Sequence, residues 1–181
     1  MVRKSLMLAL GLALTANVAL AGTAARKDLQ VFNDVANSVN RYAQFTIFDD
    51  VSANVHEGIV TLTGSVTMPY KRDDTEKRVA KIDGVSQVKD EIKVLPVSPF
   101  DDELRVRLAR SIYGNSNFWS YAAMANPPIH IIVENSRVTL TGVVNSNVDR
   151  MLARSLATQF GVLSVTNDLK TDAEMREVME K

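Results

Sequence analysis

The sequence has 181 residues, no cysteine, and 21 basic against 21 acidic side chains. A chain without net charge has no sequence-wide attraction for nucleic acid, so we expect no nucleic-acid partner. The absence of cysteine excludes disulfides, thiol redox chemistry and thiolate metal sites, so the burial of a core must hold the fold.

The first residues have the layout of a secretory signal peptide. Arg3 and Lys4 precede an apolar run over 6–14, and the small residues Ala19 and Ala21 stand just before Gly22. The alternative is a retained membrane anchor, but the run is shorter than the roughly 20 residues that span a bilayer. We therefore predict a signal peptide over residues 1–21 that is cleaved. The mature chain would carry 19 basic and 21 acidic residues.

The elements of the first half follow from apolar spacing. Val31, Val35 and Val39 form the stripe of an amphipathic helix. Alternating apolar residues over 51–55 and 60–66 predict two strands joined by a tight turn, and therefore a β-hairpin. Thr75, Val79 and Ile82 predict a second helix, and residues 88–94 a last strand.

The second half repeats this pattern. The string V-T-L-T-G occurs at both 60–64 and 138–142, and an internal repeat of this length predicts two copies of one module. A helix containing Leu104, Leu108 and Ile112 is expected, with Asp101 or Asp102 at its cap. Strands over 129–133 and 138–144 follow, then a helix and a last strand over 165–169. The apolar stripe expected on that helix consists of Val148, Leu152, Leu156 and Phe160.

The predicted fold class is α+β. Each of two tandem α-β-β-α-β modules is a small mixed three-stranded sheet with two helices packed on one face. The modules are expected over 28–95 and 101–170, joined by a linker over 96–100 that two prolines stiffen. The tail, 171–181, is expected to form a short helix.

An α-β-β-α-β unit built around V-T-L-T-G, with a Gly-Val step before its last strand (Gly84-Val85 and Gly161-Val162), resembles the BON domain. Two copies behind a signal peptide resemble the osmotically inducible periplasmic proteins of that family. The resemblance implies a periplasmic location, peripheral association with phospholipid membranes, support of the cell envelope under osmotic stress, and no catalysis.

No catalytic or metal-binding constellation stands out in the sequence. The two histidines, His56 and His130, occupy different positions in the repeat. No serine lies in a Gly-x-Ser-x-Gly context, and no glycine-rich loop is suited to phosphate. We therefore expect no enzymatic activity, no metal and no cofactor.

The two copies differ most before the first strand, where the second has an insert that contains the only tryptophan. Tryptophan and tyrosine suit a membrane interface, and nearby basic residues attract anionic headgroups. The candidate lipid-binding residues are Phe118, Trp119, Tyr121 and Met124 of the insert, and the basic residues Arg105, Arg107, Arg110, Arg150 and Arg154. The alternative is that the insert's aromatic residues fill the core or the contact between modules.

The expected partner is therefore an anionic phospholipid surface. Two other functions stay open. The first is binding of envelope proteins through a sheet face or strand edge, as a partner or as a chaperone. The second is binding of a small molecule or cell-wall fragment between the modules.

Overall fold

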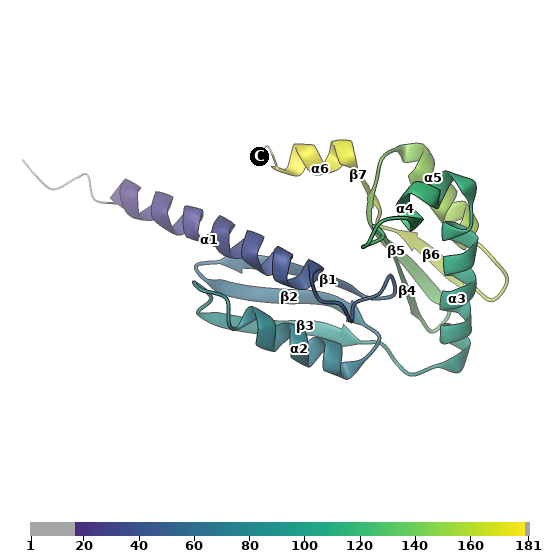
Figure 1. The fold of residues 1–181 in the computed structure, drawn as a ribbon, viewed down its shortest axis with the longest axis horizontal. Helices are drawn as coiled ribbons and strands as arrows, with labels where there is room; N and C mark the ends of the chain where they lie inside the picture. The colour runs from purple at the N-terminus through teal and green to yellow at the C-terminus, as the bar shows by residue number, and fades with distance from the viewer. Residues whose placement is uncertain (1–16, 180–181) are drawn as a thin grey trace, which may run out of the picture.

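The computed structural model describes residues 17–179, and the side chains of residues 27–177. Most of the expected signal peptide, residues 1–16, lies outside the described residues. Within residues 17–179, no helix is both long and apolar enough to cross a membrane. The chain folds into two α+β modules side by side, each with a sheet and helices, as the sequence predicts (Figure 1).

The first module consists of α1 (Asn17–Asn40), β1 (Asp50–His56), β2 (Ile59–Val66), α2 (Pro69–Val79) and β3 (Gln87–Val94). β2 is the central strand, antiparallel to β1 and parallel to β3. Its buried residues Val60, Leu62 and Val66 pack against Val31 and Val35 of α1. Burial of this one face of the sheet holds the module together.

The second module repeats the order with α3 (Pro99–Tyr113), β4 (Ile129–Glu134), β5 (Arg137–Val144), α5 (Asn147–Ala157) and β6 (Ser164–Asn167). The insert forms a 3₁₀ turn (Ser116–Phe118) and the short α4 (Trp119–Ala122). The chain ends with β7 (Lys170–Thr171), which pairs with β5, and α6 (Asp172–Met179). The strand register is the same in both modules, because Val51 lies opposite Gly64 as Ile129 lies opposite Gly142.

An aspartate at the first helix of each module binds the hairpin turn. Asp101 was expected as a possible helix cap, but Ser98 caps α3 through its side chain. The Asp101 carboxylate instead accepts hydrogen bonds from the N–H groups of Asn135 (2.8 Å) and Ser136 (2.9 Å). Both turn residues have positive φ, as in a type I′ turn, which leaves their N–H groups without strand partners. Asp28 does the same at the first turn, so residue 28 corresponds to residue 101.

The apolar stripe predicted on α5 is wrong in part. Val148 is exposed, and Phe160 is 94% exposed because the helix ends at Ala157, one turn earlier. The buried residues of α5 are Ala153 and Ala157, whose small side chains let the helix approach the sheet closely. Leu152 and Leu156 pack at the margin of this contact.

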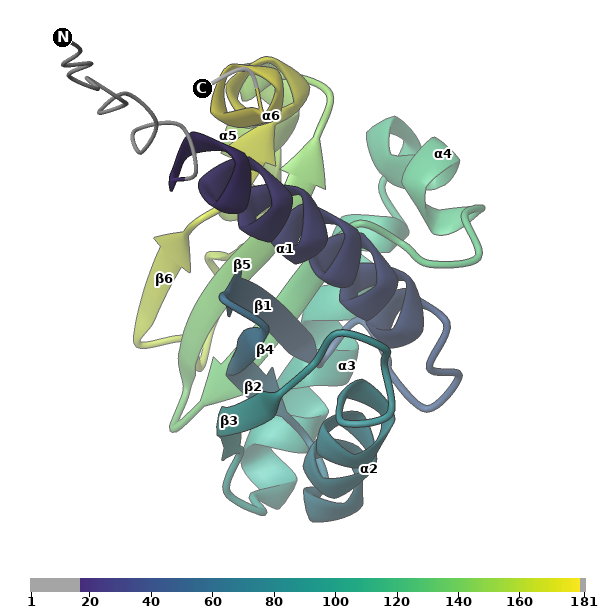
Figure 2. The same cartoon turned by 90° about the vertical axis from the view of Figure 1, so that its left-hand side faces the viewer.

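The two modules meet through the segment that precedes β1. The Ile131 N–H donates to the Ile47 carbonyl (2.7 Å), and the Ile47 and Phe48 side chains pack against the core of the second module. Lys93 and Glu134 add an ion pair of 2.7 Å across the boundary. Figure 2 shows the two sheets from the end of α1, with the strands of the second module behind β1.

Candidate functional site

The insert of the second module divides into buried and exposed aromatic residues. Phe118 and Tyr121 are buried in the core, and their rings lie 5.7 Å apart. Trp119 is 65% exposed and Met124 is about half exposed. Of the four apolar candidates for lipid contact, the fold therefore leaves two accessible.

Tyr121 is buried because its hydroxyl joins a polar network between the insert and α5. The hydroxyl accepts a hydrogen bond from the Asn145 N–H (2.8 Å) and donates one to Asp149 (3.0 Å). Burial raises the pKa of Tyr121, so the phenol can continue to donate this hydrogen bond further into the alkaline range than a free tyrosine could. Tyr121 is thus a structural residue.

The first module fills the same place with a buried ion pair. Asp49 accepts hydrogen bonds from the Thr67 N–H (2.7 Å), the residue equivalent to Asn145, and from Lys71 (2.6 Å), the residue equivalent to Asp149. Thr46 supplies two further donors. Burial alone would raise the pKa of Asp49, but the hydrogen bonds from Lys71, Thr67 and Thr46 together outweigh it and lower the pKa. Asp49 is therefore an ionised structural carboxylate.

The five candidate arginines also separate by environment. Arg105 is buried, donates to the Val133 carbonyl (2.6 Å) and pairs with Asp102. Arg150 pairs with Glu174 (2.9 Å). The other three, Arg107, Arg110 and Arg154, are partly or fully exposed. Within residues 27–177, Arg110 and Arg154 have no side-chain hydrogen bond or ion pair. The Arg107 guanidinium lies 3.8 Å from Glu103 and donates to a backbone carbonyl, so it is only partly available to a surface.

An exposed apolar patch, which the sequence analysis missed, lies at the end of the module where α3 begins. It consists of Phe100 on α3 and Phe160 and Leu163 in the loop from α5 to β6, and we call it the apolar tip. Phe160 is 94% exposed and Leu163 is 73% exposed. Arg107 donates to the Phe160 carbonyl (2.9 Å), and a Cβ added at Gly161 would lie 3.4 Å from the Phe100 ring. These contacts place Phe100 and Arg107 beside the backbone of Phe160 and Gly161. The Leu163 N–H donates to the Ser136 carbonyl, and the Ser136 N–H donates to Asp101, so Leu163 also lies near the start of α3.

The apolar tip is a difference between the copies. The α2–β3 connection of the first module is one residue longer, and polar Asp83 and Ser86 stand beside Gly84 where Phe160 and Leu163 flank Gly161. Lys27 corresponds to Phe100. An alignment of the two copies could have found the tip, but the helical spacing assigned Phe160 to the core.

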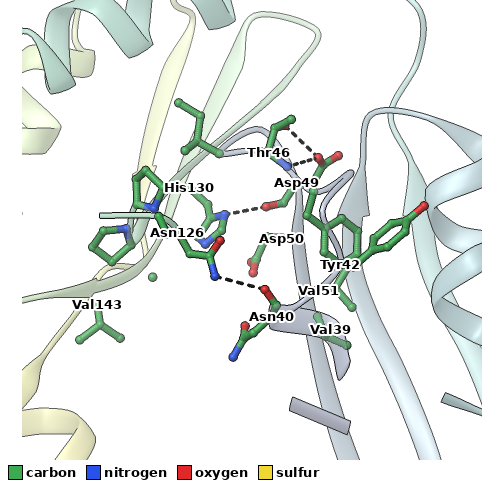
Figure 3. A pocket seen from close by; sticks show the side chains of 16 residues that line it. Val39, Asn40, Tyr42, Thr46, Asp49, Asp50, Val51, Asn126, His130 and Val143 are labelled. Atoms are coloured by element: carbon green, nitrogen blue, oxygen red, sulfur yellow. Dashed lines mark hydrogen bonds between the residues drawn. The ribbon is translucent and has the colours of Figure 1, made fainter. Parts of the chain in front are cut away.

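A cavity of about 500 Å³ lies between the modules (Figure 3). His130 reaches the Asp49 carbonyl through Nδ1 (2.6 Å), and the Asn126 amide donates to the Asn40 carbonyl (3.1 Å). Both contacts hold the modules together. Among the described residues, no three His, Asp or Glu side chains are grouped as a metal site would require.

The fold and surface describe a tandem-domain α+β protein, and sequence comparison gives its family. The model of the BON domain matches residues 33–96 and 103–173. The chain therefore belongs to the BON domain family. That family is associated with phospholipid binding and with osmotic stress proteins, and it is generally non-catalytic.

No curated protein matches the chain. Among solved structures, it is similar to CdsD, a structural protein of the type III secretion system of Chlamydia trachomatis. The identity is 14%, the match covers 83% of this chain and 97% of that chain, and the TM-score is 0.29. A structure of the C-terminal domain of CdsD matches with 12% identity, covering 78% and 96%, also with a TM-score of 0.29. Scores this low bear on neither the fold nor the function of this chain.

Proposed function

We propose that this protein is a periplasmic, non-enzymatic protein that associates with anionic phospholipid surfaces through its second module and so supports the envelope under osmotic stress. The single observation that carries the proposal is the apolar tip. Large apolar side chains exposed together mark an interaction surface rather than a random feature. Membrane association is the property linked to the family.

The composition of the tip suits a membrane interface. Phe160 and Leu163 project from a loop, so they can enter the headgroup region without a change in the fold. Removing an exposed Phe or Leu side chain from water is worth roughly 1.5–3 kcal/mol. Two such side chains are enough for reversible peripheral binding.

Accessible arginines account for the preference for anionic lipid. Arg107 lies at the tip, and Arg110 follows it by one turn on α3. Arg154 is exposed on α5, which packs against α3. Each basic residue near an anionic surface contributes about 1 kcal/mol, and salt screens this attraction. Trp119 and Met124, at the other end of α3, are proposed as a second contact.

Co-sedimentation with vesicles tests the proposal. The probe is phosphatidylcholine vesicles with and without phosphatidylglycerol, and the variant is Phe160→Ser with Leu163→Ser. Because both side chains are exposed, the variant should fold normally, and its affinity for anionic vesicles should fall by about tenfold or more. Raised salt should weaken binding of the unaltered protein.

The matched control is Leu29→Ser with Phe32→Ser, the same chemical change at exposed positions of the first module. It should bind vesicles as the unaltered protein does. Absence of binding to any vesicle, or equal loss in both double variants, would refute the proposal. A blue shift of Trp119 emission on binding would extend the contact to the insert, and binding without a shift would restrict it to the tip.

A further inference from the structure

The outer edge of β4 in the second module is capped at each of its three outward-facing residues. The Tyr113 hydroxyl accepts from the N–H of Ile129 (3.1 Å) and donates to its carbonyl (2.6 Å). The Ile131 N–H donates to the Ile47 carbonyl, and the Val133 carbonyl accepts from Arg105. All three strand residues are buried. A capped edge cannot pair with another strand.

The equivalent edge of β1 in the first module is open. By the shared register, Val51, Ala53 and Val55 correspond to these three residues of β4. Within residues 27–177, no hydrogen bond reaches their outward N–H or C=O groups, and their side chains are only half-buried. Asn40 of the first module corresponds to Tyr113, which caps β4. No hydrogen bond from the Asn40 side chain reaches β1 among the described residues, and the Asn40 carbonyl accepts a hydrogen bond from the Asn126 side chain.

The first module also lacks the helix-borne ion pair that covers the strand edge in the second module. Because Asp28 corresponds to Asp101, Leu29 takes the place of Asp102 and Phe32 the place of Arg105. An ion pair that caps the edge is thus replaced by two apolar side chains, 62% and 40% exposed. The open edge of β1 therefore runs beside an uncharged, apolar part of α1.

We propose that the open edge of β1 binds an extended segment of another protein as an added strand. The segment would have alternating apolar and polar residues. Its apolar side chains would lie beside Leu29 and Phe32, and its polar ones would continue the exposed face of Ser52 and Asn54. Backbone hydrogen bonds at such an edge give affinity, and alternate side chains give specificity. This inference does not depend on lipid binding.

The molecule already contains one contact of this kind. In the segment that precedes β1, the Ile47 carbonyl accepts a hydrogen bond from the Ile131 N–H at the β4 edge, and the Ile47 and Phe48 side chains pack on the adjoining core. In a second copy of the chain, this segment is engaged by its own second module, and the β4 edge is capped. A second copy could offer only its own β1 edge, whose Val51, Ala53 and Val55 already pack against that copy's core. A segment of a different protein can instead bring free apolar side chains to Leu29 and Phe32, which favours it as the partner.

A capping swap tests the proposal. The variant Leu29→Asp with Phe32→Arg gives the first module the counterpart of the Asp102–Arg105 ion pair, which caps the β4 edge in the second module. The probe is a fluorescein-labelled peptide of alternating valine and threonine, and its binding is followed by fluorescence anisotropy. The swap should weaken binding by roughly tenfold or more. The matched control, Gln30→Asp with Asn33→Arg, places the same charges at the same spacing on exposed positions of α1 and should bind normally.

A second measurement keeps the test independent of the fold of the variants. N-methylation of alternate amides in the peptide removes its hydrogen-bond donors and should abolish binding to the unaltered protein. Amide shifts in NMR spectra should then map to Val51–Val55. Equal binding of the swap and the unaltered protein, retained binding of the N-methylated peptide, or shifts confined to the second module would overturn the proposal. Dimerisation through β1 that the peptide does not compete with would also overturn it, in favour of a second copy.

Discussion

Replacing Lys71 by methionine should destabilise the first module strongly. The side chains of Lys71 and Asp49 are 5% and 1% exposed, and their charged atoms lie 2.6 Å apart. The variant keeps the length of the side chain but leaves the Asp49 carboxylate buried without its counter-charge. Breaking a buried pair from one side costs about 3–5 kcal/mol. We place Lys71→Met at the lower end, about 3 kcal/mol, because Thr46 and Thr67 still donate to Asp49.

Urea unfolding followed by two probes measures this loss. Far-ultraviolet circular dichroism reports both modules, whereas fluorescence reports only the second, because Trp119 is the only tryptophan. The change should therefore appear mainly in the dichroism transition. Arg72→Met is the matched control. The Arg72 side chain is 40% exposed, so its ion pairs with Asp73 (3.1 Å) and Asp90 (3.6 Å) are each expected to contribute under about 1 kcal/mol. Similar costs for the two variants would refute the reasoning, as would additivity in a double-mutant cycle with Asp49→Asn.

The Asp49–Lys71 pair should make the first module less stable as the pH falls. The pKa of Asp49 is lower in the folded state than in the unfolded chain, so its stabilising contribution is present above the unfolded pKa. This contribution is lost as the pH falls through the folded pKa. The acid limb of the dichroism transition should be shallower in Asp49→Asn, and an unchanged limb would count against an ionised Asp49.

Three further outcomes are expected. Tyr121→Phe leaves the Asn145 N–H and the Asp149 carboxylate without their shared partner, and should cost about 1–3 kcal/mol in urea unfolding followed by Trp119 fluorescence; no measurable cost would show that water replaces the hydroxyl. Gly142→Ala should cost several kcal/mol, on the order of 3 or more, because φ is 109° and the new Cβ would lie 1.9 Å from a backbone carbonyl oxygen; normal thermal unfolding of this variant would contradict the register. Burial and the hydrogen bond to Asp74 raise the pKa of Tyr42 to about 12, so the ultraviolet absorbance of this phenol should titrate later than that of a free tyrosine. The stability that Tyr42 contributes should decline between about pH 10, the pKa of the unfolded chain, and the folded pKa. Asp74→Asn should lower the folded pKa, and an unchanged titration would show that Asp74 does not influence Tyr42.

The two copies use one scaffold and differ at its surfaces. Both bind the hairpin turn through an aspartate and bury the same face of the central strand. The apolar tip occurs only in the second copy and the open strand edge only in the first. We therefore expect the lipid and protein contacts to be separable by mutation.

The sequence by itself determined the repeat, the order of elements and the α+β class. Period-two spacing in Val60–Val66 and Val138–Val144 and helical spacing in α1 and α3 are local, so they can be read without contacts. The two hairpin turns can be predicted for the same reason, because Gly58 and Asn135 are residue types that tolerate the positive φ that these turns require.

Which candidate residues are exposed was decided by the tertiary structure. The sequence cannot tell that Tyr121 enters a buried network while Trp119 stays exposed, because the difference depends on Asp149 and Asn145 more than twenty residues away. Phe160 fits a helical stripe by spacing, but the helix ends before it and leaves its ring in solvent. Burial is a property of all the segments that meet at a point, and local spacing records only one of them.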